Sequence, residues 1–214
     1  MTRSTRWTVA VLAVVVALAA GLWMQLDNGE RSGGGSERVS RERRDADTPE
    51  ALAGPRARAD LQPCPAAGTG EGPPKLRGIT VGCAGNGTEV DVARALAGRA
   101  VVLNLWAYWC APCAEELPAM AEYQRRVGPA VTVVTVHQDE NETAALLRLA
   151  ELGVHLPTLQ DGRRLIAAAL QVPNVMPATV VLRPDGSVAQ ILPRSFANAD
   201  EVAAAVDPEI GVPG

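Results

Sequence analysis

Residues 101–118 read VVLNLWAYWCAPCAEELP, and this stretch decides the fold. The apolar run at 101–106 predicts a strand that is buried on both faces, as in a parallel sheet. Pro112 and the acids that follow it mark the start of a helix. The stretch therefore carries two cysteines, Cys110 and Cys113, from the end of a strand to the N-terminus of a helix.

This placement favours redox chemistry at Cys110. The free N–H groups and partial positive charge of a helix N-terminus stabilise a thiolate and lower the pKa of the first cysteine. The two-residue spacer lets Cys113 close a disulfide onto Cys110. Two alternatives are a purely structural disulfide and half of a zinc site. A zinc site needs a second close pair of ligands, and Cys64 and Cys83 are not spaced in that way.

The motif WCAPC at 109–113, followed by Glu116 and Pro118, resembles the TlpA/ResA-type membrane-anchored thioredoxin-like oxidoreductases. The resemblance covers roughly residues 62 to 206. It implies an α/β thioredoxin-like fold, with a mixed central sheet flanked by helices, and thiol–disulfide exchange without a cofactor or metal. In that chemistry Cys110 attacks the substrate and Cys113 resolves the mixed disulfide.

The same resemblance assigns further site residues. Pro177 precedes an apolar strand where thioredoxin-like proteins hold a cis proline, and Met176 then faces the substrate chain. Trp109 is expected to form an apolar rim around the exposed sulfur. Glu116 is the candidate proton acceptor, because Asn104 stands where cytosolic thioredoxins have a titratable aspartate. The alternative is that Glu116 is only an acid favoured by the helix dipole.

The N-terminal region predicts export of the domain. Residues 7–26 carry no charge and have about the length needed to cross a bilayer, and Arg3 and Arg6 precede them. We therefore expect a single-pass cell-membrane protein with a cytoplasmic tail at 1–6, a signal anchor at 7–26 and an extracytoplasmic C-terminal domain. The competing interpretation is a signal peptide cleaved near Ala20, which also exports the domain.

Residues 27–61 predict a flexible, disordered linker, because they are rich in glycine and mixed charge and lack apolar periodicity. The folded domain is then expected at 62–214. In an exported domain, the even cysteine count favours a structural disulfide between Cys64 and Cys83.

The domain is expected to alternate strands and helices. Strands are predicted at 78–81, 101–106, 131–136, 156–159, 178–183 and 188–192. Helices are predicted at 88–97, from Pro112 onward, from 139 to Gly153, at 163–170 and at 198–206.

These features predict a protein-disulfide reductase whose partners are client proteins with cysteine pairs, of the cytochrome c maturation type. The resemblance also implies a DsbD/CcdA-like membrane electron donor. The alternatives are a disulfide-forming oxidant, a copper-delivery protein on the same fold and a structural interaction module. A peroxidase is disfavoured because Ala107 replaces the expected threonine, and the net charge of −4 argues against a nucleic-acid partner.

Overall fold

The computed structural model describes residues 47–211. The predicted cytoplasmic tail, the membrane anchor at 7–26 and the linker up to residue 46 lie outside the described residues. Between residues 47 and 211, the structure has no helix that combines the length and apolar character needed to cross a membrane.

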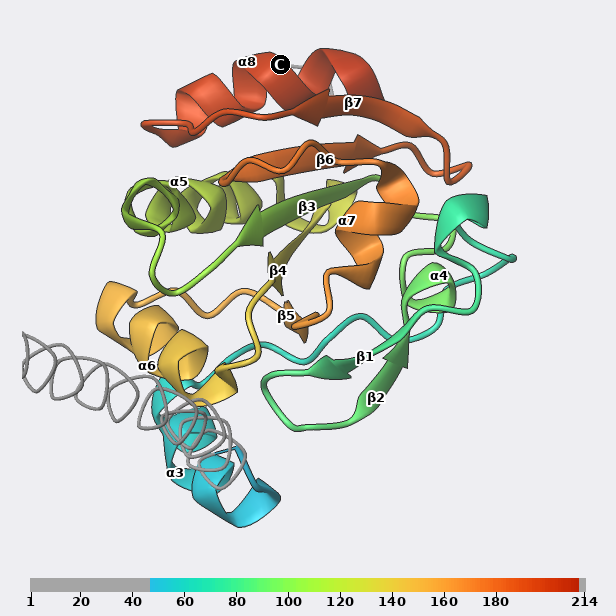
Figure 1. The fold of residues 1–214 in the computed structure, drawn as a ribbon. Helices are drawn as coiled ribbons and strands as arrows, with labels where there is room; N and C mark the ends of the chain where they lie inside the picture. The colour runs from blue at the N-terminus through green and yellow to red at the C-terminus, as the bar shows by residue number, and fades with distance from the viewer. Residues whose placement is uncertain (1–46, 212–214) are drawn as a thin grey trace, which may run out of the picture. The chain divides into compact units, whose positions relative to one another are not determined.

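A seven-stranded mixed sheet forms the centre of the domain, in the order β2-β1-β5-β4-β3-β6-β7 (Figure 1). The strands are β1 Thr80–Cys83, β2 Glu89–Asp91, β3 Val101–Trp106, β4 Thr132–His137, β5 Thr158–Gln160, β6 Ala178–Leu182 and β7 Val188–Leu192. The central strands β3, β4 and β5 are parallel. On one side β1 pairs antiparallel with β5 and β2 with β1, and on the other β6 pairs antiparallel with β3 and β7 with β6. The predicted mixed sheet is thus confirmed.

Helices cover both faces of this sheet (Figure 1). They are α3 Pro49–Ala59, α4 Val92–Ala95, α5 Ala111–Val127, α6 Glu142–Leu152, α7 Leu165–Leu170 and α8 Ala199–Ile210, with 3₁₀ turns η1 Pro74–Leu76 and η2 Gly128–Ala130. Buried side chains of α5, α6 and α8 form one apolar cluster with the sheet, and those of α4 and α7 form a second. The two clusters lie on the two faces of the sheet, as expected when strands and helices alternate along the chain.

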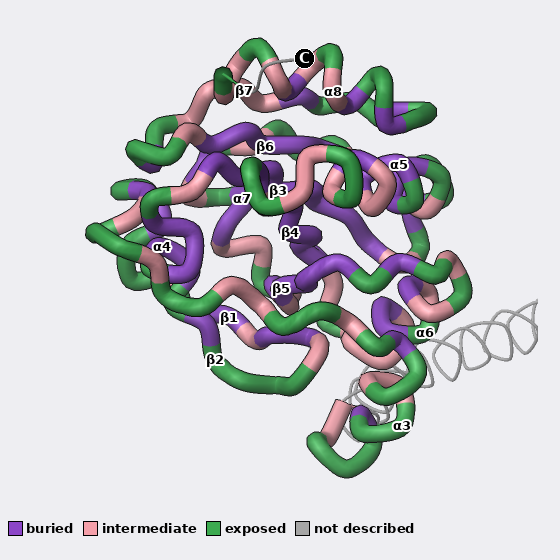
Figure 2. Tube along the Cα trace, turned by 180° about the vertical axis from the view of Figure 1, so that it is seen from behind, coloured by how far each residue is buried: buried purple, intermediate pink, exposed green. Residues whose placement is uncertain are grey.

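Strand β3 is buried along its whole length, as its apolar run predicts. Val102 and Trp106 point into the cluster under α5, and Leu103 and Leu105 point into the cluster under α7. Figure 2 shows the central strands in the colour of buried residues. The redox motif therefore follows a fully buried strand of the domain.

Some predicted helix boundaries are confirmed by their caps. Asn141 caps α6 by accepting from Ala144 N, and the left-handed Gly153 ends that helix. Asn198 caps α8, but α8 continues to Ile210, beyond the predicted end at 206. The predicted helix at 88–97 is partly wrong, because residues 89–91 pair with β1 as strand β2.

The prediction that a disordered linker reaches residue 61 is wrong for residues 47–61. This segment contains α3, which lies against α6 (Figure 1). Leu52 and Ala59 are buried beside Leu146, and the Arg56 guanidinium lies 2.9 Å from the Glu142 carboxylate. Leu52 and Ala59 are the buried residues of this helix, which is too few for an apolar periodicity to reveal it.

Candidate active site

The structure joins Cys110 to Cys113 in a disulfide with a Cα–Cα distance of 5.3 Å. Cys110 is the N-cap of α5, and its sulfur accepts from the backbone N–H of Cys113 at 3.3 Å. The same N–H and the helix dipole favour a thiolate at Cys110 once the bond is reduced. Cys110 is 6% exposed and Cys113 is completely buried. Only Cys110 can therefore be reached by an incoming substrate sulfur.

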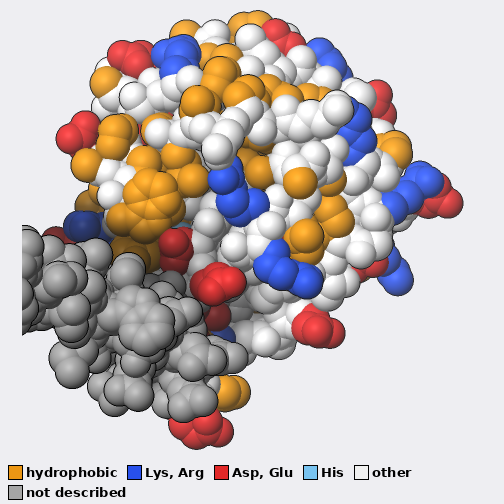
Figure 3. All heavy atoms as spheres, in the orientation of Figure 1, with side chains coloured by type: hydrophobic (Ala, Val, Ile, Leu, Met, Phe, Trp, Pro, Cys, Tyr) orange, Lys and Arg blue, Asp and Glu red, His pale blue; other side chains and the backbone are white. Residues whose placement is uncertain are grey.

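A surface groove of about 550 Å³ opens beside Cys110. Its walls are formed by Trp109, Cys110, Ala111, Pro112, Gln138, Arg164, Asn174, Val175 and Met176. Trp109 is 59% exposed and Val175 is 47% exposed, so the groove presents apolar surface to solvent. Figure 3 shows hydrophobic side chains gathered on the face where β3 leads into α5. Trp109 lines this groove together with Cys110, and its role as a rim around the sulfur stays a prediction.

The Met176–Pro177 peptide bond is cis, as the resemblance implies. Pro177 is buried directly before β6, whose Ala178 pairs with Leu105 of β3. This pairing places the proline beside the end of the strand that carries the redox motif. Met176 consequently lines the groove together with Cys110.

Glu116 is fully buried, three residues after Cys113 on the same helix. Its carboxylate accepts from Asn104 Nδ2 at 2.7 Å and from the backbone N–H of Phe196 at 3.2 Å. Burial raises the pKa of Glu116 to about 7, although both hydrogen bonds and the charge of Arg194 lower it. A carboxyl with this pKa can take up or release a proton near neutral pH.

Two partners of Glu116 were not predicted from the sequence. The sequence identifies Asn104 only as a side chain that does not titrate, whereas in the structure its amide donates to the carboxylate. Phe196 is 80 residues away in the chain, in the segment between β7 and α8, and no sequence signal links it to Glu116. The spacing within α5 could identify the acid but not its long-range partners.

His137 lies at the end of β4 beside the redox loop. It is fully buried, its Nδ1 lies 2.9 Å from Gln160 Oε1, and its ring packs against Trp106 and Tyr108. Burial lowers the pKa of His137, so the ring favours its neutral form. Among residues 47–211, no cluster of histidines, cysteines and acids is arranged to hold a metal ion.

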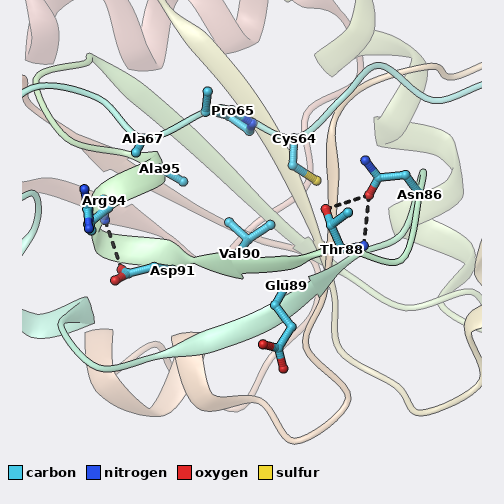
Figure 4. A pocket seen from close by; sticks show the side chains of 11 residues that line it. Cys64, Pro65, Ala67, Asn86, Thr88, Glu89, Val90, Asp91, Arg94 and Ala95 are labelled. Atoms are coloured by element: carbon cyan, nitrogen blue, oxygen red, sulfur yellow. Dashed lines mark hydrogen bonds between the residues drawn. The ribbon is translucent and has the colours of Figure 1, made fainter.

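Cys64 and Cys83 form a second disulfide, with a Cα–Cα distance of 5.9 Å. Cys83 is almost fully buried in β1, and Cys64 borders a separate pocket of about 450 Å³ beside β2 and α4 (Figure 4). The polar groups at this pocket bond locally, as Thr88 does to Asn86. None of the residues that line it belongs to the groove at Cys110. The pairing expected from the cysteine count is therefore present, away from the redox motif.

Known proteins resemble this chain in sequence. Residues 75–191 match the AhpC/TSA family model. The thiol-disulfide oxidoreductase ResA of Bacillus subtilis is 32% identical over 108 residues, which cover 50% of this chain and 59% of that protein. ResA of Oceanobacillus iheyensis is 31% identical over 101 residues, covering 45% and 50%. The match thus spans little more than half the length of these curated relatives.

Two solved structures extend the comparison. A secreted Mycobacterium tuberculosis disulfide oxidoreductase, described as homologous to Escherichia coli DsbE, is 26% identical with a TM-score of 0.52. The similarity covers 61% of this chain and 97% of that one. A DsbF homologue from Corynebacterium diphtheriae is 28% identical with a TM-score of 0.53, over 61% of this chain and 83% of that one. The predicted thioredoxin-like fold and the resemblance to ResA-type proteins are confirmed.

Proposed function

This chain belongs to the AhpC/TSA family, and we propose that it is a thiol–disulfide oxidoreductase that reduces the disulfides of client proteins. One observation carries the proposal: Cys110 and Cys113 sit at the N-terminus of α5, at an open groove bordered by the cis Met176–Pro177 bond. A structural disulfide needs no groove and no adjoining substrate-facing backbone. The names of the ResA relatives support the same reaction class.

The exchange has two sulfur-transfer steps. The Cys110 thiolate attacks one sulfur of the client disulfide, which forms a mixed disulfide and releases the other client sulfur as a thiolate that takes a proton. Glu116 then accepts the proton of Cys113, and the Cys113 thiolate attacks the Cys110 sulfur. This second step releases the client's remaining thiolate and leaves the Cys110–Cys113 disulfide. Two electrons have passed from the domain to the client.

We place this reaction outside the cytoplasm. The charge-free stretch at 7–26 supports a membrane anchor, and the Cys64–Cys83 disulfide suits an oxidising compartment. A membrane protein of the DsbD/CcdA type would then return two electrons to the Cys110–Cys113 pair. Clients of the cytochrome c maturation type, with paired cysteines, fit this arrangement.

The second candidate is the reverse reaction, in which the domain forms disulfides in exported proteins. The helix N-terminus at Cys110 favours it, because a stabilised thiolate makes the corresponding disulfide more oxidising. The C. diphtheriae and M. tuberculosis neighbours, named as a DsbF homologue and a disulfide oxidoreductase, are compatible with either direction.

The reduction potential of the Cys110–Cys113 pair separates the two directions. A reductant requires a value below about −180 mV, and a value well above it indicates an oxidant. The exchange itself is tested with reduced protein and a disulfide-bonded client. Cys113→Ser should trap the client on Cys110, and the absence of any mixed disulfide would contradict the proposed function.

A further inference from the structure

One wall of the groove beside Cys110 is polar, and Arg164 is the charged residue in that wall. The guanidinium donates through Nε to Gln138 Oε1 at 3.1 Å and through Nη1 to Asn174 Oδ1 at 2.7 Å. Both partners are neutral amides, so they fix the orientation of the guanidinium without compensating its charge. Within residues 47–211, Arg164 forms no ion pair.

The acids near this wall are already engaged. Asp161 interacts electrostatically with Arg164, but its carboxylate accepts the backbone N–H groups of Leu165 and Ile166 at the start of α7. Asp139 accepts from Trp109 Nε1 at 3.1 Å and so is tied to the apolar rim. Of the described residues that line the groove, Arg164 alone carries a charge. An acidic ligand would therefore meet a cation there that forms no ion pair within residues 47–211.

The backbone of Arg164 and the side chain of Gln138 support the same interpretation. Arg164 has a left-handed conformation, with φ 57° and ψ 35°, which is uncommon for a residue with a side chain. Its N–H donates to Asp161 O at 2.9 Å and closes the turn that leads into α7. Gln138 is 6% exposed, and its Nε2 has no hydrogen-bond partner among the described residues. An unpaired buried donor beside a guanidinium favours an anionic or carbonyl ligand.

We propose that Arg164 determines client specificity by binding an acidic side chain that lies close to the client's reactive cysteine. Gln138 and Asn174 position the guanidinium. Its remaining N–H groups can donate hydrogen bonds to a carboxylate. Trp109 and Val175 supply apolar contact for neighbouring client residues. The occupant of the groove is thus an extended peptide with an acid near its disulfide. This inference rests on the proposed function, because it concerns the substrate of the same site.

The test uses three disulfide-bonded peptides that differ at one position next to a cysteine, which is glutamate, glutamine or lysine. The reduced protein should reduce the glutamate peptide about tenfold faster than the lysine peptide at low salt, measured as kcat/KM. Arg164→Gln should bring this ratio close to one, and Arg164→Lys should retain part of it. Arg163→Gln is the matched control, since Arg163 is exposed and does not line the groove.

The outcomes are distinct. A glutamate preference in the parent protein that survives Arg163→Gln, and that weakens as salt is raised, supports the inference without depending on the folding of any Arg164 variant. Equal reduction of all three peptides by the parent protein would overturn the inference while leaving the proposed function standing. Equal loss of the preference in the Arg163 and Arg164 variants would also overturn it. Reduction of none of the peptides would overturn the proposed function and the inference with it.

Discussion

The two disulfides of the described domain have different surroundings. Cys110–Cys113 lies at a helix N-terminus, at an open groove and one helical turn from a buried carboxyl. Cys64–Cys83 joins the segment after α3 to β1, with Cys83 buried in the sheet. On the proposed function, the helix end, the groove and the carboxyl of Glu116 make Cys110 reactive, whereas the Cys64–Cys83 pair serves to hold the chain.

The largest effect should come from removing the reactive sulfur. Cys110→Ser should lower the exchange rate more than about a thousandfold, because the attacking thiolate is lost. The measurement is the turnover of a disulfide-bonded client by the reduced protein. Cys64→Ser with Cys83→Ser is the matched control and should retain exchange. Comparable loss of turnover in both variants would erase the distinction between the two pairs.

The Cys64–Cys83 pair should matter for stability instead. Replacing both residues by alanine removes a cross-link between residues 19 apart, which should lower the free energy of unfolding by about 3 kcal/mol on the chain-entropy model. The midpoint of thermal unfolding should fall by about 10 °C. Denaturant titration and calorimetry measure these changes. An unchanged midpoint would show that this disulfide does not constrain the unfolded chain.

Glu116→Gln should slow exchange by about a hundredfold near pH 7, since the proton of Cys113 loses its acceptor. The pH–rate profile should also lose the step near the pKa of Glu116, about 7. Glu115→Gln is the matched control, because Glu115 is the exposed neighbour on the same helix. A profile for Glu116→Gln that overlays that of the parent would reduce Glu116 to a buried structural acid.

The raised pKa of Glu116 also predicts the direction in which the stability of the fold changes with pH. Its pKa is raised on folding, from 4.5 to about 7, so the folded state holds its proton more tightly than the unfolded state. The stabilisation is fully present below pH 4.5 and is lost as pH rises through about 7. Glu116→Gln should therefore be more stable relative to the parent at pH 8 than at pH 5. Urea titrations at the two pH values measure the difference, and the opposite order would contradict the assignment.

The smallest effect is expected at α3, the helix that precedes Cys64. Arg56 donates to Ala84 O, next to Cys83, and pairs with Glu142 while its side chain is 16% exposed. Arg56→Ala should cost about 2 kcal/mol of unfolding free energy and leave exchange unchanged. Arg58→Ala, an exposed arginine on the same helix, should cost far less. Equal stability of the two variants would mean that α3 adds little to the domain.

The sequence predicted the redox region far better than the N-terminal one, for a physical reason. The strand, the helix start, the two cysteines and Glu116 follow one another within 101–118, so local patterns describe them. The helix α3 is held to α6 by contacts such as Arg56 with Glu142, which are 86 residues apart. Asn104 with Glu116 and Arg164 with Gln138 are likewise contacts made by the fold. No local sequence pattern predicts which side chains of different elements come into contact in the fold.

The most direct test of the central claim is the redox titration of both cysteine pairs in one protein sample. The protein is equilibrated in thiol–disulfide buffers of graded potential, its free thiols are alkylated, and each cysteine is identified by mass mapping. Cys110 and Cys113 should titrate together and reversibly, with a midpoint below about −180 mV. Cys64 and Cys83 should stay oxidised until the potential falls below about −300 mV. Reduction of Cys64–Cys83 before Cys110–Cys113 would contradict the account.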